Sequence, residues 1–282
     1  MNIVDLKIKK VLHRLLGKYV YMKSSDAYHS IKPLPDFLII GTQKGGTTSL
    51  YNYLISHPQV LGAAKKEILY FDYNFSECEK WYRKFFPLLA RLRNNFLTGE
   101  ADPDYLYHLR APERIARTIE NVRLIIILRN PVDRAISHYW FEVKGGHEKL
   151  SICEAFKKEK KRITEAKRRI LAQQNYYSFE YEHFSYLDRG KYAEQIKRYW
   201  AYFNPNQILI LKSEDLFNQT QNTFNRITDF LNLQNYKLQN IKPYNVGKYQ
   251  RSGSNNLRES LTEFYEPYNN ELYNFLDIDP WW

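Results

Sequence analysis

The sequence is poor in cysteine and lacks long apolar runs. Its 282 residues include only two cysteines, Cys78 and Cys153, which show neither metal-ligand spacing nor a disulfide framework. No stretch approaches the ~20 apolar residues of a membrane-spanning helix, and no signal peptide is evident. These absences favour a protein of a reducing compartment, and we expect it in the cytoplasm.

Acidic residues are outnumbered by basic ones. The chain has 42 Lys and Arg against 31 Asp and Glu, which gives a formal net charge of +11 and a pI near 9.3. Such an excess favours anionic partners, among them nucleotides, acidic glycans and membrane surfaces. Nothing in the sequence resembles a nucleic-acid-binding module, so we do not expect nucleic acid as a partner. The 24 tyrosines suit a sugar- or base-lined cleft, although a general compositional bias explains most of them.

Residues 1–34 form a basic amphipathic segment that differs from the rest of the chain. Its apolar residues fall at helical spacing, with basic residues between them: Ile8, Val11, Leu12, Leu15, Leu16 and Tyr19. Such a helix usually packs on its own domain. The alternative is contact with an anionic membrane surface through residues 1–20, at the inner membrane face.

From residue 36 onward, strand-like and helix-like segments alternate. Candidate strands are residues 37–40, 59–62, 96–99, 123–128 and 207–212. This alternation predicts an α/β fold with a central parallel sheet flanked by helices on both faces. We expect one domain over residues 35–282, with a helical insertion at about 144–190 and a helix over residues 255–276. Ligands of such sheets bind beyond the carboxyl ends of the strands, where Gly41, Glu100 and Arg129 are expected.

Residues 35–51 combine a buried strand, a glycine turn with one lysine, and a helix start. Backbone amides at a helix start, together with the helix dipole, favour an anion. The turn adds close backbone approach, a full positive charge and hydroxyl donors through Lys44, Gly45, Gly46, Thr47, Thr48 and Ser49. The lysine precedes the glycine pair, so the turn is not a Walker A motif.

Residues 123–139 form a second strand–turn–helix unit. An apolar run over residues 124–128 predicts a strand covered on both faces. Arg129 follows it, Pro131 suits the first turn of a helix, and Ser137 lies about two helical turns into that helix. An arginine and a hydroxyl in this arrangement could hold one phosphate group together.

The two units together resemble the cofactor motifs of the sulfotransferase superfamily that uses 3′-phosphoadenosine 5′-phosphosulfate (PAPS). The resemblance implies a P-loop-like three-layer fold. It also implies that Lys44 and residues 45–49 bind the 5′-phosphosulfate, while Arg129 and Ser137 bind the 3′-phosphate. The product would be adenosine 3′,5′-bisphosphate. Animal relatives in the Golgi carry an amino-terminal anchor that this chain lacks, so we expect a bacterial cytoplasmic enzyme.

Further segments resemble the heparan sulfate and carbohydrate branch of this superfamily. Residues 66–72 match the segment whose glutamate is the catalytic base, which implies that role for Glu67. The segments at residues 81–87, 186–195 and 207–216 extend the resemblance over residues 35–278. Residues 99–105 depart from the pattern, because Ala101 stands where the family usually has a lysine and Asp102 and Asp104 are extra carboxylates.

Two basic segments leave alternatives open. The resemblance matches Lys248, Arg251 and Ser252 to a loop that closes over the nucleotide, although a solvated loop fits nearly as well. Residues 157–169 are dominated by basic side chains. We interpret them as a charged helix face, with a lid or groove for an acidic polymer as the alternative.

The resemblance implies transfer of a sulfuryl group from PAPS to a hydroxyl or amine. Lys44 would neutralise charge on the leaving phosphate, and Glu67 would accept the acceptor's proton. No metal is expected. His138 and His108 are alternative bases, and His147 and Asp102 are candidates for the acceptor site.

The expected acceptor is a carbohydrate or glycolipid, with a small metabolite as the alternative. Two other functions compete with sulfuryl transfer: a P-loop-type nucleotide kinase, and a non-catalytic binder of acidic glycans or membrane surfaces.

Overall fold

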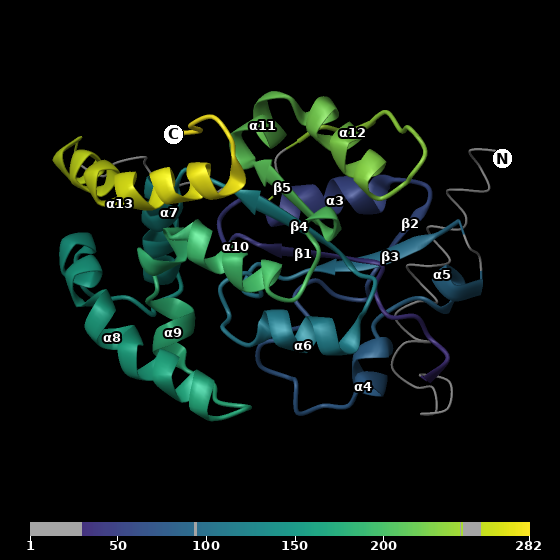
Figure 1. The fold of residues 1–282 in the computed structure, drawn as a ribbon, viewed down its shortest axis with the longest axis horizontal. Helices are drawn as coiled ribbons and strands as arrows, with labels where there is room; N and C mark the ends of the chain where they lie inside the picture. The colour runs from purple at the N-terminus through teal and green to yellow at the C-terminus, as the bar shows by residue number, and fades with distance from the viewer. Residues whose placement is uncertain (1–29, 93–94, 243, 245–254) are drawn as a thin grey trace.

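A five-stranded parallel sheet forms the centre of the computed structural model (Figure 1). The strand order is β2-β3-β1-β4-β5, and every neighbouring pair is parallel. The strands are β1 (Phe37–Gly41), β2 (Val60–Gly62), β3 (Leu97–Ala101), β4 (Arg123–Leu128) and β5 (Ile208–Lys212). These bounds confirm the predicted α/β fold. Two expectations are wrong, because Gly41 is the last residue of β1 and Glu100 lies inside β3, so neither residue follows its strand.

The structure describes residues 30–92, 95–242, 244 and 255–282. The predicted amphipathic helix of the N-terminal segment therefore lies outside the described residues. The same is true of Lys248, Arg251 and Ser252. Their roles stay predictions, as does the division of the chain into an N-terminal segment and one domain.

Alternate residues of the central strands enter two separate cores, because successive side chains of a strand point to opposite faces. Leu38 and Ile40 of β1 pack with α6 (Ala111–Thr118) and α10 (Tyr192–Trp200). Phe37 and Ile39 pack on the other face with α3 (Thr47–Ser56) and α12 (Thr220–Phe230). Figure 1 shows α3 and α12 above the sheet and α6 below it. Strands β1 and β4 are covered on both sides, which accounts for their continuous apolar sequence.

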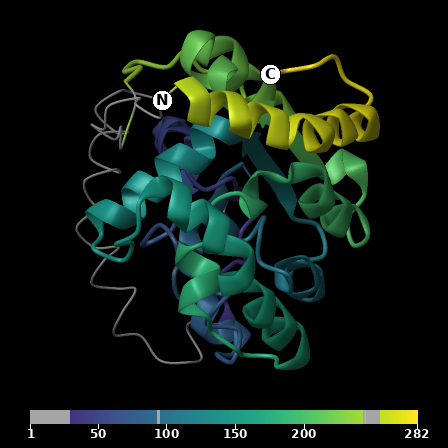
Figure 2. The same ribbon diagram turned by 90° about the vertical axis from the view of Figure 1, so that its left-hand side faces the viewer.

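A second group of helices lies beyond the carboxyl end of β4 (Figure 1). It comprises α7 (Pro131–Lys144), α8 (Ile152–Ala172), α9 (Phe179–His183) and α13 (Asn255–Leu276). Residues of α7, α8 and α13 share a third apolar cluster, and Figure 2 shows α13 crossing above the teal helices. The remaining elements are short: α4 (Glu79–Arg83), α5 (Leu88–Leu92), α11 (Ser213–Asn218), η1 (Asp188–Gly190) and η2 (Pro205–Gln207).

Helix α8 contains the basic run at residues 157–169. Part of its charge is paired, because Arg162 forms an ion pair with Glu148, and Arg168 and Arg169 both pair with Glu165. This pattern agrees with a charged helix face. Among the helices of the described residues, none has the length and apolar character needed to cross a membrane.

Candidate active site

The sheet order brings the two predicted anion-binding units together. Strand β1 lies between β3 and β4, with Leu38 opposite Glu100 on one side and Gly41 opposite Ile126 on the other. All three strands are parallel, so the segments that follow them meet at one edge of the sheet.

The loop of residues 42–46 is held tightly against β4. The amide of Thr42 donates to the Ile127 carbonyl at 2.9 Å. A β-carbon at Gly45 would lie 2.7 Å from that same carbonyl oxygen, so only glycine fits there. Gly46 precedes α3 with a φ of 103°, a conformation that glycine adopts without strain. Helix α3 then begins at Thr47, and residues 47–50 contain no acidic side chain that would compete for the helix N-terminus.

The pKa of the Lys44 side chain is lower than usual. Burial lowers the pKa of its ammonium group to about 8, and repulsion from Arg129 adds to this effect. The carboxylate of Glu142 acts in the opposite direction. The Nζ atom of Lys44 lies 4.3 Å from the centroid of the Phe141 ring of α7. An incoming anion would therefore meet a cation that is partly stripped of water, where electrostatic attraction is strong.

Arg129 joins the second unit to the first. Its Nη1 donates a hydrogen bond to the carbonyl of Lys44 at 3.1 Å. The hydroxyl of Tyr192 in α10 donates to the Arg129 carbonyl at 2.7 Å, which fixes the backbone at the end of β4. Ser137 lies on α7 and is fully buried, and its role toward a 3′-phosphate stays a prediction.

Two residues that follow β5 support both loops, and the sequence interpretation assigned them no role. The Ser213 hydroxyl donates to the Gly45 carbonyl at 2.7 Å. The Glu214 carboxylate accepts a hydrogen bond from the Asn130 amide at 3.0 Å. The Asn130 side chain in turn caps α7, accepting from the amides of Val132 and Asp133. The end of β5 thus supports the glycine loop and the start of α7.

In the first unit, the sequence predicts that the Ser49 hydroxyl donates a hydrogen bond to an anion, but this hydroxyl is bonded to the Tyr244 backbone. It donates to the Tyr244 carbonyl at 3.4 Å, accepts from the Tyr244 amide at 2.9 Å and is fully buried. Its predicted contact with a ligand is untested, as are those of Thr47 and Thr48.

Residues 67–69 are laid along the end of β3 by three successive backbone amides. The acceptors are the Ala101 carbonyl (3.2 Å), Glu100 Oε2 (3.3 Å) and Asp102 Oδ2 (3.2 Å). Glu67 and Leu69 have φ values of 59° and 61°, a left-handed conformation that costs energy for residues other than glycine. The Glu67 side chain is 48% exposed and pairs with Lys66. A carboxylate is thus presented to solvent at the strand end next to β1.

The carboxylates of residues 100–104, at the end of β3, are buried or paired. Glu100 is fully buried, accepts hydrogen bonds from the hydroxyls of Tyr82 and Tyr105, and has its pKa raised to about 7 by burial. Asp102 is also fully buried, so it does not line an open acceptor site as the sequence suggested. Asp104 forms an ion pair with the buried Arg189. Both aspartates therefore hold the fold together at this edge.

The two alternative bases are poorly placed. His108 and His138 are buried, and burial lowers the pKa of each imidazole to about 3. His147 is different, since its side chain is 39% exposed and contacts Glu142. Glu67 is therefore the candidate base that solvent reaches at the strand ends.

Comparison with known proteins identifies the family to which the chain belongs. The family model described as "Sulfotransferase domain" matches residues 34–272. The membrane-associated sulfotransferase kil1 of Dictyostelium discoideum is 28% identical over 88% of this chain. Heparan sulfate glucosamine 3-O-sulfotransferase 3B1 of Homo sapiens is 27% identical over 89% of it. The bifunctional heparan sulfate N-deacetylase/N-sulfotransferase 3 of Homo sapiens is 31% identical over 70% of it.

These matches differ in how much of each relative they cover. The chain spans 66% of the length of kil1, 65% of the 3-O-sulfotransferase and 22% of the bifunctional enzyme. The crystal structure of a sulfotransferase from Alicyclobacillus acidocaldarius superposes with a TM-score of 0.69 and 28% identity, over 88% of this chain and 97% of that one. The chain described here belongs to the sulfotransferase domain family and is an enzyme of that family.

Proposed function

We propose that this sulfotransferase moves a sulfuryl group from PAPS to a hydroxyl or amine of a carbohydrate or glycolipid. The observation that carries the proposal is the contact between the two anion-binding units, in which Arg129 hydrogen-bonds the backbone of Lys44. Two cations and the N-terminus of α3 then face one edge of the sheet. A nucleotide with phosphate groups at two ends matches this charge distribution.

In the proposed step, the oxygen or nitrogen of the acceptor attacks sulfur in line with the leaving phosphate. The bond between sulfur and the bridging oxygen breaks, and adenosine 3′,5′-bisphosphate leaves. Lys44 neutralises the charge that develops on the leaving oxygen. The acceptor's proton passes to the carboxylate of Glu67. The step as written balances without an oxidant, a reductant or a further reactant.

A carbohydrate acceptor is supported by the names of two relatives, which act on heparan sulfate. Helix α8 also exposes four lysines that would attract an acidic polymer: Lys157, Lys158, Lys160 and Lys161. Ala101, which replaces the family's lysine, is fully buried, so that position offers no charge to an acceptor. A cytoplasmic location and membrane contact through residues 1–20 stay predictions.

The proposal is tested by incubating the protein with sulfur-labelled PAPS and a panel of glycans, glycolipids and small hydroxylated metabolites. Lys44→Ala and Glu67→Gln should each abolish transfer of the label. Glu79→Gln is a matched control, because Glu79 is 47% exposed and also pairs with a neighbouring cation. Full activity in Glu67→Gln would show that another group is the base.

The competing functions give different results in the same assay. A nucleotide kinase would consume ATP without PAPS. A non-catalytic binder would transfer no label and would bind acidic glycans equally well after Lys44→Ala.

A further inference from the structure

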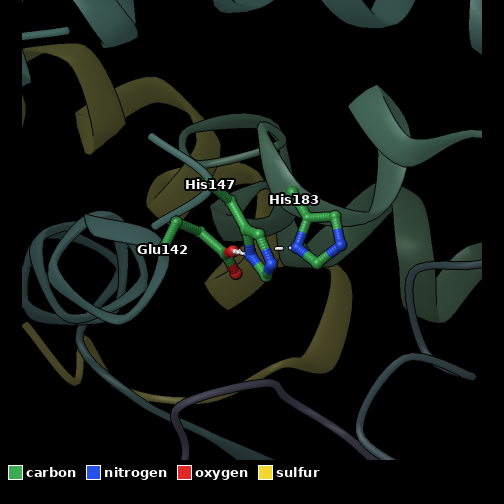
Figure 3. A group of neighbouring side chains, drawn as sticks. All are labelled: Glu142, His147 and His183. Atoms are coloured by element: carbon green, nitrogen blue, oxygen red, sulfur yellow. Dashed lines mark hydrogen bonds and ion pairs between the residues drawn. The ribbon is translucent and has the colours of Figure 1, made fainter. Parts of the chain in front are cut away.

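A cluster of one carboxylate and two imidazoles lies next to the transfer site. Figure 3 shows Glu142, His147 and His183 converging, with both rings directed at the same carboxylate. The Nδ1 atoms of His147 and His183 each lie 2.8 Å from Glu142 Oε2. Across the three side chains, the candidate ligand atoms lie within 4.8 Å of one another. The residues come from three segments: the end of α7, the loop that follows it, and the end of α9.

The carboxylate of this cluster is buried. Glu142 is 1% exposed, and its Oε2 is the shared partner of both imidazole Nδ1 atoms. His138, which is fully buried, places Nε2 3.3 Å from the second oxygen, Oε1. Neither that oxygen nor the His138 ring nitrogens make a well-aligned hydrogen bond within the described residues. The carboxylate therefore keeps acceptor capacity that these contacts do not use.

We propose that Glu142, His147 and His183 form a binding site for a divalent transition-metal ion of the zinc type. Two imidazole nitrogens and one carboxylate oxygen are a ligand set that zinc uses with a water in the fourth position. His147 is 39% exposed, which leaves the site open to solvent on its side. His138 lies behind the carboxylate, with Nε2 3.3 Å from Oε1, where a residue outside the ligand set can contact a metal-binding carboxylate.

Zinc binding requires the two histidine nitrogens to move away from the Glu142 oxygen. Zinc lies about 2.0–2.2 Å from nitrogen and oxygen ligands, so tetrahedral ligand atoms are separated by roughly 3.3 Å. The present separations of 2.8 Å must therefore open by about half an ångström. His147 follows Gly146, which has a φ of 78°, and nothing lies within 4 Å of a β-carbon built there. The space beside Gly146 is therefore open.

The surroundings favour a borderline-soft ion. Nitrogen ligands suit zinc, copper and nickel, whereas magnesium and calcium prefer oxygen. The Phe179 ring lies 4.2 Å from the His183 ring and 5.5 Å from the His147 ring, and it forms an apolar wall. Glu182 adds a carboxylate 3.9 Å from His183 Nε2. The buried Arg189 opposes a cation, but its charge is offset by the ion pair with Asp104. We therefore expect zinc to bind and magnesium not to compete.

The position of the cluster gives the ion a structural consequence. Phe141, whose ring faces the ammonium of Lys44, immediately precedes Glu142 on α7. An ion on Glu142, His147 and His183 would join α7, the following loop and α9 beside Lys44. It takes no part in the transfer step, so this inference does not depend on the proposed function.

The test uses the full chain, freed of metal with a chelator and then dialysed against Zn²⁺. We expect one zinc per chain by metal analysis, no loss of zinc when Mg²⁺ is added in excess, and the ligand-field spectrum of a tetrahedral site with Co²⁺. His147→Ala and His183→Ala should each weaken zinc binding by about 100-fold or more, since they remove a ligand outright. His57→Ala is the matched control. His57 follows the C-terminal end of α3, outside the cluster, and its ring contacts the Gln234 carbonyl.

Two results would overturn the proposal: no stoichiometric zinc on the wild-type chain, or unchanged zinc affinity in the folded His147→Ala variant. His147 lies in a partly exposed loop, so this variant is expected to fold, which circular dichroism would verify. Lys44→Ala separates the two proposals, because it should lose sulfuryl transfer while retaining zinc.

Discussion

The Arg129 guanidinium donates a hydrogen bond from Nη1 to the backbone carbonyl of Lys44, across 3.1 Å. These residues are far apart in the sequence and belong to the loops that follow β4 and β1. The bond leaves other guanidinium N–H groups for a ligand, since arginine has five donors. The same side chain thus holds the glycine loop and is available to a phosphate.

Replacing Arg129 with Ala should weaken binding of adenosine 3′,5′-bisphosphate by about 10- to 100-fold. This range follows from the ~1.5–3 kcal/mol attributed to hydrogen bonds with charged groups. Arg129→Lys should fall between wild type and Ala, because lysine lacks the planar fork. Isothermal titration calorimetry measures these affinities, and Arg117→Ala, at a 66% exposed surface position, is the control. Equal affinity in wild type and Arg129→Ala would remove Arg129 from the nucleotide site.

The pH dependence of catalysis should report Lys44. Its pKa is lowered to about 8, so the ammonium loses its proton as pH rises through that value. In the proposed mechanism the charged form is the active one, and kcat/KM should therefore fall by about tenfold per pH unit on the alkaline side. Lys44→Arg keeps its charge and should show a flat profile over this range, whatever its absolute rate. The same alkaline decline in Lys44→Arg would assign it to another group.

Ser213 should act as a positioning residue. Ser213→Ala removes the hydrogen bond to the Gly45 carbonyl, which should cost about 1 kcal/mol of unfolding free energy and weaken nucleotide binding. Ser56→Ala is the control, because its hydroxyl donates to the Tyr53 carbonyl at the other end of α3. It should lower stability to a similar degree and leave nucleotide affinity unchanged. Urea denaturation and calorimetry together separate the two effects, and a Ser213→Ala variant with wild-type affinity would contradict the role.

Glu100 should make stability depend on pH. Its pKa in the folded chain is raised from an ordinary value of 4.5 to about 7, so its protonated form stabilises the fold at low pH. That contribution is lost as pH rises through about 7. Relative to Glu100→Gln, the wild-type unfolding free energy should fall by roughly 3 kcal/mol as the pH rises from 4.5 to about 7. Parallel pH curves for the two proteins in urea denaturation would show that Glu100 does not titrate in this way.

Much of the fold was readable because the signals are local. The apolar runs at β1 and β4 predict buried parallel strands, and the predicted helix over residues 255–276 coincides with α13. The meeting of Lys44 and Arg129 also follows, because parallel strands end at one edge. Glu100 was misplaced because a glutamate usually ends an apolar strand. Here Glu100 is buried within β3 because the hydroxyls of Tyr82 and Tyr105 donate hydrogen bonds to its carboxylate. No sequence pattern indicates these contacts.

The supporting contacts of the site leave no pattern in the sequence. Ser213 and Glu214 act on a backbone carbonyl and a backbone amide, which any residue supplies. Glu142 and His147 are separated from His183 by the whole of α8, so no motif spacing joins them. Only tertiary packing brings these groups together, and only the structure reveals them.

The backbone amides of residues 67–69 are attached to β3, whereas the glycine loop is attached to β4 and to the end of β5. Glu67, the proposed proton acceptor, and the glycine loop, the proposed nucleotide-binding segment, are therefore attached to different strands. Under the proposed function, substitutions around residues 100–105 would change how an acceptor is presented and leave the glycine loop intact. Relatives with different acceptors could diverge by this route without rebuilding their shared chemistry.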